Sequence, residues 1–175
     1  MGELAATATA NDAQIAITNP GGIRADLGYP SSPAGEGDGV VTYGEAFTVQ
    51  PFGNIMQTVT LTGAQLKAVL EQQWHADGTA TFLQISASLS YTWSASAPIG
   101  SKVSKLELNG AQIDPAATYR VSINNFLAGG GDGFTVFTQG TGLTGGPIDL
   151  DALTAYLTDN KPVAPPGLDR ITVEP

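Results

Sequence analysis

The chain has 175 residues, of which 42% are hydrophobic and only 13% are charged. This length suits a single domain spanning residues 1–175, with enough apolar side chains for a substantial core. Its 16 acidic residues against 7 basic ones give a net charge of −9, which disfavours binding to a nucleic acid polymer or to an anionic membrane. With no cysteine in the sequence, disulfides and thiolate metal sites are excluded.

Targeting signals are not evident. No apolar run approaches the length of a transmembrane helix, and residues 1–4 lack the basic and apolar regions of a signal peptide. If the parent protein is exported, we expect its signal to lie outside this sequence. Residues 3–9, rich in alanine and threonine, are expected to form the last turns of a helix.

The hydrophobic pattern predicts an α+β fold. Apolar residues in continuous or alternating order predict strands at residues 13–17, 55–61, 81–93, 103–108, 118–123 and 170–173. Helical spacing predicts a helix over residues 64–74, capped by Thr62, and another over 149–157. Asn109 and Gly110 predict a hairpin turn, and residues 28–39 and 140–147 read as loops. We therefore expect mixed and antiparallel sheets with packed helices, and loops gathered at one edge.

The first unusual turn, residues 19–24, follows the strand predicted at 13–17. It contains Asn19, two glycines and Arg24, whose planar guanidinium suits a carboxylate, a phosphate or an aromatic face. A structural salt bridge from Arg24 to one of the many acidic residues is the competing interpretation.

The second turn, residues 51–54, places Phe52 between a proline and a glycine and is followed by Asn54. Proline restricts the backbone before Phe52, and the Asn54 amide offers both a donor and an acceptor. A phenylalanine so placed is either held at the surface for binding or is a core aromatic at the edge of a strand.

The third turn, residues 124–134, carries three consecutive glycines and Asp132 between Phe126 and Phe134. Glycines let another molecule approach the backbone closely, and a plain hairpin turn needs fewer of them. The sequence favours a binding loop here, and the alternative is a flexible surface loop with both phenylalanines in the core.

In the same order, these turns resemble the motifs of the C-terminal domain of the 5′-nucleotidase family, and the likeness extends over nearly the whole chain. The resemblance implies that Phe52 and Phe126 sandwich a nucleobase, that Asn54 contacts the base and that Asp132 accepts hydrogen bonds from ribose hydroxyls. Base stacking on aromatic rings is worth about 1–3 kcal/mol per base, and a carboxylate suits a diol.

The resemblance also implies that Arg24, with Asn19 beside it, holds the phosphate end of a nucleotide. Members of the family commonly use a further arginine upstream, and residues 1–18 contain none. We therefore expect this chain to bind a phosphate less well than it binds a base.

Catalysis in that family belongs to an N-terminal metallophosphoesterase domain with two divalent metal ions, which this chain is expected to lack. We therefore expect no cofactor, no metal site and no catalytic residue in this chain, which by itself is predicted to be inactive. Its implied partners are a nucleotide or nucleoside and that N-terminal domain, against which it would move. The parent is implied to be secreted or attached to the cell surface.

Two alternatives from other functional classes remain. The first is a stand-alone interaction or structural domain that keeps the fold without binding a ligand, and it predicts a pocket filled by side chains. The second is an independent hydrolase in which Asp132 acts with His75, the only histidine, as the base. A solvated position at a helix end is the simpler interpretation of His75.

Overall fold

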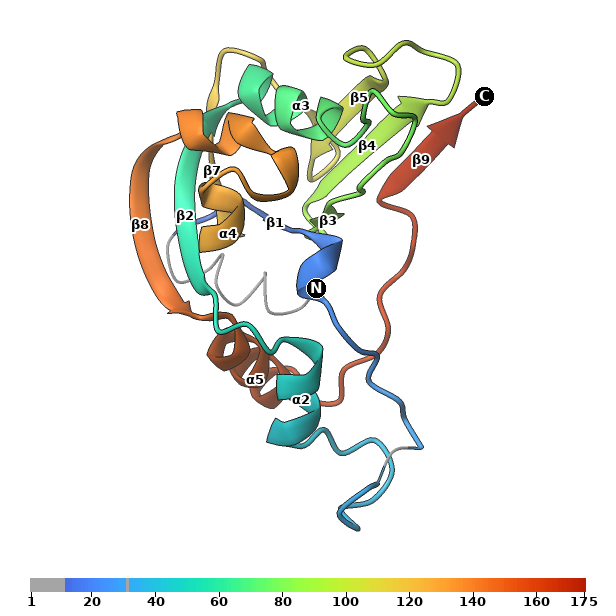
Figure 1. The fold of residues 1–175 in the computed structure, drawn as a ribbon, viewed down its shortest axis with the longest axis vertical. Helices are drawn as coiled ribbons and strands as arrows, with labels where there is room; N and C mark the ends of the chain where they lie inside the picture. The colour runs from blue at the N-terminus through green and yellow to red at the C-terminus, as the bar shows by residue number, and fades with distance from the viewer. Residues whose placement is uncertain (1–11, 31) are drawn as a thin grey trace.

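The computed structural model describes residues 12–30 and 32–175 (Figure 1). Helices α2, α3, α4 and α5 are accompanied by short 3-10 turns. The elements in chain order are β1 (Ile15–Thr18), α2 (Tyr43–Val49), β2 (Ile55–Thr62), α3 (Gly63–Glu71), β3 (Gln84–Ile85), β4 (Leu89–Ser94), β5 (Val103–Leu108), β6 (Ala111–Gln112), β7 (Thr118–Asn124), α4 (Asn125–Ala128), β8 (Thr141–Ile148), α5 (Asp149–Asp159) and β9 (Ile171–Glu174).

Two mixed sheets form the framework. The larger has the order β3-β1-β7-β2-β8, in which β1 and β7 are parallel and the other pairs are antiparallel. The smaller has the order β6-β5-β4-β9, with β9 parallel to β4 along its edge. The predicted fold class, with mixed and antiparallel strands and packed helices, is confirmed.

A single large core joins both sheets to α3. Thr62 and Gln65 form a capping box that begins the helix as predicted, and its apolar face, which includes Leu66 and Leu70, is fully buried. At the other end of α3, the Glu71 carboxylate accepts hydrogen bonds from the backbone N–H groups of Lys102 and Val103. The helix is thereby attached to the smaller sheet as well as to β2.

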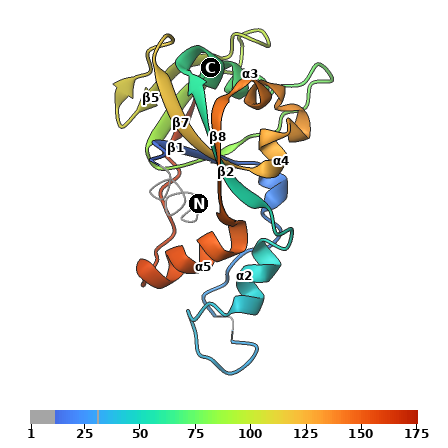
Figure 2. The same cartoon turned by 90° about the vertical axis from the view of Figure 1, so that its left-hand side faces the viewer.

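Helices α2 and α5 pack side by side at the end of the larger sheet, away from α3 (Figures 1 and 2). Ala46 and Val49 of α2 meet Leu150 and Leu153 of α5 in a small apolar cluster of their own. The pairing sets the direction in which the chain leaves α2 and enters β2, and this connection carries the second predicted turn.

Two segments differ from the sequence-based expectations. Residues 140–147 were expected to be a loop, but Thr141–Ile148 forms strand β8 at the edge of the larger sheet, with register shifts where it pairs with β2. Residues Tyr43–Val49, for which no helix was expected, form α2 behind a capping box of Thr42 and Glu45. The helix expected over residues 3–9 lies outside the described residues.

The remaining predicted strands and the hairpin are confirmed, except that residues 81–93 are divided between β3 in the larger sheet and β4 in the smaller one. Asn109 and Gly110 adopt positive φ angles of 50° and 79° between β5 and β6, as their turn requires. Within the described part of the chain, the helices are too short or too polar to cross a membrane.

Candidate functional site

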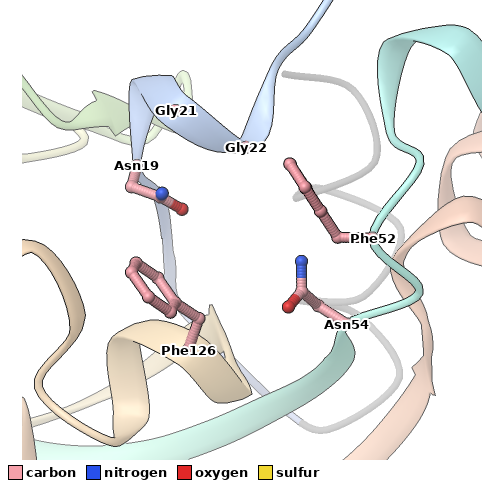
Figure 3. A pocket seen from close by; sticks show the side chains of 6 residues that line it. All are labelled: Asn19, Gly21, Gly22, Phe52, Asn54 and Phe126. Carbon is pink, nitrogen blue, oxygen red and sulfur yellow. The ribbon is translucent and has the colours of Figure 1, made fainter.

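A cavity of about 340 Å³ opens where the connection from α2 to β2 faces the ends of β1 and β7 (Figure 3). Its walls come from all three predicted turns, which are far apart in sequence. The lining residues are Asn19, Gly21, Gly22, Phe52, Asn54 and Phe126.

Phe52 and Phe126 stand on opposite sides of this space (Figure 3). Their side chains are 58% and 43% exposed, although both are large and apolar. The core position considered for Phe52 is therefore wrong. For the third turn, the core position holds for Phe134, which is fully buried, but not for Phe126. Two exposed aromatic rings across a cavity provide faces on which a flat ligand could stack.

The Phe126 ring is held close to the backbone of the glycine stretch. A Cβ atom at Gly131 would overlap the ring, so this position admits only glycine without a shift of Phe126. The next residue, Asp132, adopts φ 54° and ψ 19°, a left-handed conformation that is uncommon for a side chain other than glycine, asparagine or aspartate. The third turn is therefore an ordered structure of α4 and a 3-10 turn, in which close packing explains one of the glycines.

Asn19 connects Asp132 to the cavity. The Asn19 Nδ2 donates a hydrogen bond of 3.0 Å to Asp132 Oδ2, and its Oδ1 accepts one of 3.0 Å from Asn124 Nδ2. Asn19 and Asn124 are each only 5% exposed, whereas Asp132 is exposed. Asp132 does not line the cavity itself, but it is bonded to a residue that does.

Asn54 has a partner that the sequence did not suggest. Its Nδ2 donates a hydrogen bond of 3.0 Å to Asp149 Oδ2, and its backbone oxygen accepts from the Asp149 N–H. Asp149, the first residue of α5, is buried, and its Oδ1 accepts from the N–H of Leu150. A carboxylate accepts hydrogen bonds and does not donate them, so the Asn54 amide is oriented with its nitrogen toward Asp149.

Arg24 is exposed beside the cavity and pairs with an aromatic ring. Its guanidinium carbon lies 5.8 Å from the centroid of the Phe52 ring, and Nη1 is 3.4 Å from the oxygen of Gly21. Among the described residues it forms no ion pair, so the predicted salt bridge is not seen. Stacked near the Phe52 ring and without an ion pair to any described residue, the guanidinium is able to meet an anion beside the cavity.

His75 does not belong to this cavity. Its Nε2 lies 3.1 Å from Thr81 Oγ1 in the turn that follows α3. In the same turn, hydrogen bonds from the hydroxyl and the N–H of Thr79 lower the pKa of the Asp77 carboxyl. Within residues 12–30 and 32–175, no three acidic or histidine side chains are grouped as metal ligands would be.

Of the predicted site residues, Asn19, Phe52, Asn54 and Phe126 line the cavity, whereas Arg24 and Asp132 do not. Sequence reasoning missed two residues that support this arrangement. Asn124 was seen only as the start of the glycine stretch, and Asp149 only as the start of a helix. Both act through contacts more than 90 residues away in the chain, which the sequence does not reveal.

Known proteins resemble the chain over most of its length. A family model described as 5′-nucleotidase, C-terminal domain, matches residues 2–139. A cell wall protein of Listeria monocytogenes is 39% identical over 153 residues, which cover 86% of this chain and 19% of that protein. A trifunctional nucleotide phosphoesterase of Bacillus subtilis is 38% identical over 164 residues, which cover 89% of this chain and 10% of that protein.

Comparison with solved structures indicates the same family. The crystal structure of a 5′-nucleotidase precursor from Thermus thermophilus matches with a TM-score of 0.84 and 35% identity, over 99% of this chain and 35% of that one. The chain therefore spans less than two fifths of the length of each of these proteins. Because the family model covers well over half of the residues and includes all three turns in order, the chain belongs to the 5′-nucleotidase C-terminal domain family.

Proposed function

We propose that this domain binds the nucleoside part of a nucleotide and orients it for hydrolysis by another domain of the parent protein. The observation that carries the proposal is the cavity of about 340 Å³ with exposed phenylalanine rings on two sides. A purine is flat and apolar on its faces and has polar groups along its edge. It suits two rings with an amide, that of Asn54, between them.

For the other site residues we propose the roles that the family resemblance implies. Asp132 presents a carboxylate to ribose hydroxyls, and Asn19 lies between it and the cavity. Arg24, which lies close to the Phe52 ring, meets the phosphate end of the nucleotide, together with Asn19. The charged phosphate would thus lie at the mouth of the site, and the base would lie inside it.

Phosphoester hydrolysis in the parent would depend on two divalent metal ions in an N-terminal metallophosphoesterase domain, which supply the activated oxygen and stabilise the leaving group. The residues of this chain bind and orient, and none is assigned to that chemical step. A cell wall protein is among the relatives, and we propose an extracellular or surface location for the parent.

The interaction-domain alternative predicts a pocket filled by side chains, whereas an open cavity with exposed rings favours ligand binding. The alternative with His75 as a base requires it to act with Asp132. His75 is hydrogen-bonded to Thr81 and lines no part of the cavity, and this disfavours the second alternative.

Calorimetric titration of adenosine and AMP into the chain tests the proposal, with phosphate release assayed with and without added divalent metal. Phe126→Ala should weaken adenosine binding by about fivefold to a hundredfold, the equivalent of one lost stacking face. Tyr29→Ala is the matched control, because this ring is 74% exposed and lies outside the cavity lining.

Saturable binding that falls in Phe126→Ala but not in Tyr29→Ala, without phosphate release, supports a recognition domain. Tighter binding of AMP than of adenosine supports a contact between Arg24 and the phosphate. If neither ligand produces heat, the nucleoside pocket is wrong and the interaction-domain alternative gains. Phosphate release by the chain alone would instead favour an independent hydrolase.

A further inference from the structure

We propose that Asn124 is a positioning residue for the ligand, acting on Asp132 through the amide of Asn19. This inference rests on the proposed function, because it concerns how the carboxylate assigned to ribose is held. Asn124 is buried at the end of β7 and does not line the cavity.

The direction of each hydrogen bond in the series from Asn124 through Asn19 to Asp132 follows from the bond that Asn124 forms with the backbone. Asn124 is the N-cap of α4, and its Oδ1 accepts from the N–H of Leu127 at 2.9 Å. A backbone N–H can only donate, so the Asn124 oxygen must face Leu127 and its nitrogen must face Asn19. The N-cap therefore fixes which way the Asn124 amide is turned.

The same logic fixes Asn19. Its Oδ1 must accept from Asn124 Nδ2, so its own Nδ2 faces Asp132 Oδ2 at 3.0 Å. Both amides are almost completely buried, so water does not substitute for either partner. One carboxylate oxygen is thus held by a donor of fixed orientation. The other, Asp132 Oδ1, has no hydrogen-bond partner among the described residues and remains available to a ligand.

A reason to position this carboxylate lies in its backbone. Asp132 adopts a left-handed φ of 54° on an exposed turn, between two glycines that impose little restraint. A side chain on such a turn samples several rotamers unless a partner selects one. If the ligand had to select the rotamer, the conformational entropy lost on binding would weaken the affinity. The hydrogen bond from Asn19 selects one rotamer before the ligand arrives.

The test exploits the fact that aspartate and asparagine are comparable N-caps. Asn124→Asp keeps an oxygen for the N–H of Leu127 but puts an acceptor where Nδ2 faced Asn19. The Asn19 amide must then turn to donate to the new carboxylate, and its oxygen is brought against Asp132. Asn124→Ser also keeps a cap, and it removes the donor without adding an opposing acceptor.

Adenosine and 2′,3′-dideoxyadenosine are the probes, because both are uncharged and only the first has the ribose hydroxyls that Asp132 would accept from. We expect Asn124→Asp to weaken adenosine binding at least about tenfold and to leave dideoxyadenosine within about twofold. Asn124→Ser should show the same selectivity with a smaller fall, and it carries the test if Asn124→Asp does not fold.

A ligand-free readout accompanies the titrations. The side-chain NH₂ resonances of Asn19 in a nitrogen–proton NMR spectrum should shift in Asn124→Ser and also in Asp132→Asn, because each variant changes one neighbour of this amide. Unchanged Asn19 resonances in both variants overturn the relay of hydrogen bonds.

The possible failures are distinct. If the unsubstituted chain binds neither nucleoside, the proposed function fails and this inference fails with it. If the unsubstituted chain binds adenosine and the Asn124 variants bind it equally well, only the positioning role is overturned. An equal loss for both nucleosides also overturns it, because that result indicates general damage to the site.

Discussion

At the scale of single residues, the position of the Phe126 ring depends on the side chain that Gly131 lacks. The ring occupies the space where a Cβ would stand, and the φ angle of Gly131 is not in the positive range that favours glycine. The requirement for glycine is therefore steric and acts on a neighbour that lines the cavity. A substitution here tests the cavity without touching any group assigned to the ligand.

We expect Gly131→Ala to push the Phe126 ring away and to weaken adenosine binding by up to the value of one stacking face, about 1–3 kcal/mol. Titration calorimetry measures the effect. Gly145→Ala is the matched control, because a Cβ there meets no atom within 4 Å and its φ is not positive. Unchanged affinity in Gly131→Ala would contradict a role for Phe126 in binding.

Tyr91 offers a prediction about stability at high pH. Burial in the core raises the pKa of its hydroxyl from 10.0 to about 12, although a hydrogen bond with Gln73 opposes this rise. The folded state therefore keeps a proton that the unfolded state releases. This contribution to stability is complete below pH 10 and is lost as the pH rises from 10 to about 12.

In denaturant unfolding between pH 9 and 12, the free energy of unfolding should fall by up to about 3 kcal/mol more in the unsubstituted chain than in Tyr91→Phe. The variant provides the baseline, because the lysines titrate in both proteins. Parallel pH profiles for the two proteins would show that the Tyr91 hydroxyl ionises as readily in the fold as outside it.

At the scale of elements, the N-terminus of α5 fixes the second turn. Asp149 begins the helix and receives hydrogen bonds from the side chain of Asn54 and from its own neighbour, Leu150. The packing of α5 on α2 therefore determines where Asn54 stands, and a helix outside the cavity becomes part of its construction.

Asp149→Ala should lower the free energy of unfolding by about 1–3 kcal/mol, because it leaves a partly buried amide and a helix N–H without an acceptor. It should also weaken adenosine binding, since Asn54 becomes free to turn. Denaturant unfolding and calorimetry measure the two effects. Asp151→Ala is the control, an exposed acidic residue in the same first turn of α5, and comparable losses in both variants would exclude a special role for Asp149.

The elements that sequence predicted were those with an uninterrupted pattern. Polar and apolar residues alternate along strand β7, and the Thr62 cap predicts the start of α3. Helix α2 was missed because its seven residues include a glycine, aromatic residues and β-branched residues, all poor helix formers, and its stability comes from the Thr42 capping box and the contact with α5. Strand β8 was missed because three glycines and a proline suggest a loop, whereas pairing with β2 decides the outcome.

In the site, too, features set by the local sequence were predicted and features set by tertiary contacts were missed. Local turn chemistry drew attention to Phe52 and Phe126 but left a core position open for both, as Phe134 beside Gly133 in fact adopts. The family resemblance then gave Phe52, Phe126 and Asn54 their places around a ligand, and all three line the cavity. The partners that orient these groups, such as Asn124 and Asp149, come into place only when distant strands and helices assemble. Their residue types are also common at helix starts, so the sequence contains no separate signal for their second contact.

At the scale of the whole molecule, the cavity is a product of the assembled fold. Its walls follow β1, precede β2 and follow β7, and these three strands are joined through β7 at the centre of the larger sheet. A ligand that binds there binds only the folded state, and its binding energy adds to the stability of the entire domain.

Adenosine at about 100 times its dissociation constant should raise the free energy of unfolding by about 2.7 kcal/mol. Thermal unfolding followed by circular dichroism would record this as a higher midpoint, and Phe126→Ala should reduce the rise at the same ligand concentration. A midpoint that does not respond to adenosine at any concentration would contradict a site formed by the native fold.

The irregular strand β8 has a consequence for behaviour at high concentration. An exposed sheet edge can template pairing with a strand of another molecule, the first step toward aggregation. Here the edge carries two register shifts, flexible glycines and Pro147, which cannot donate a backbone hydrogen bond. The glycines and the proline that suggested a loop in the sequence therefore make β8 a poor template for pairing. The high negative charge of the chain adds electrostatic repulsion between approaching copies.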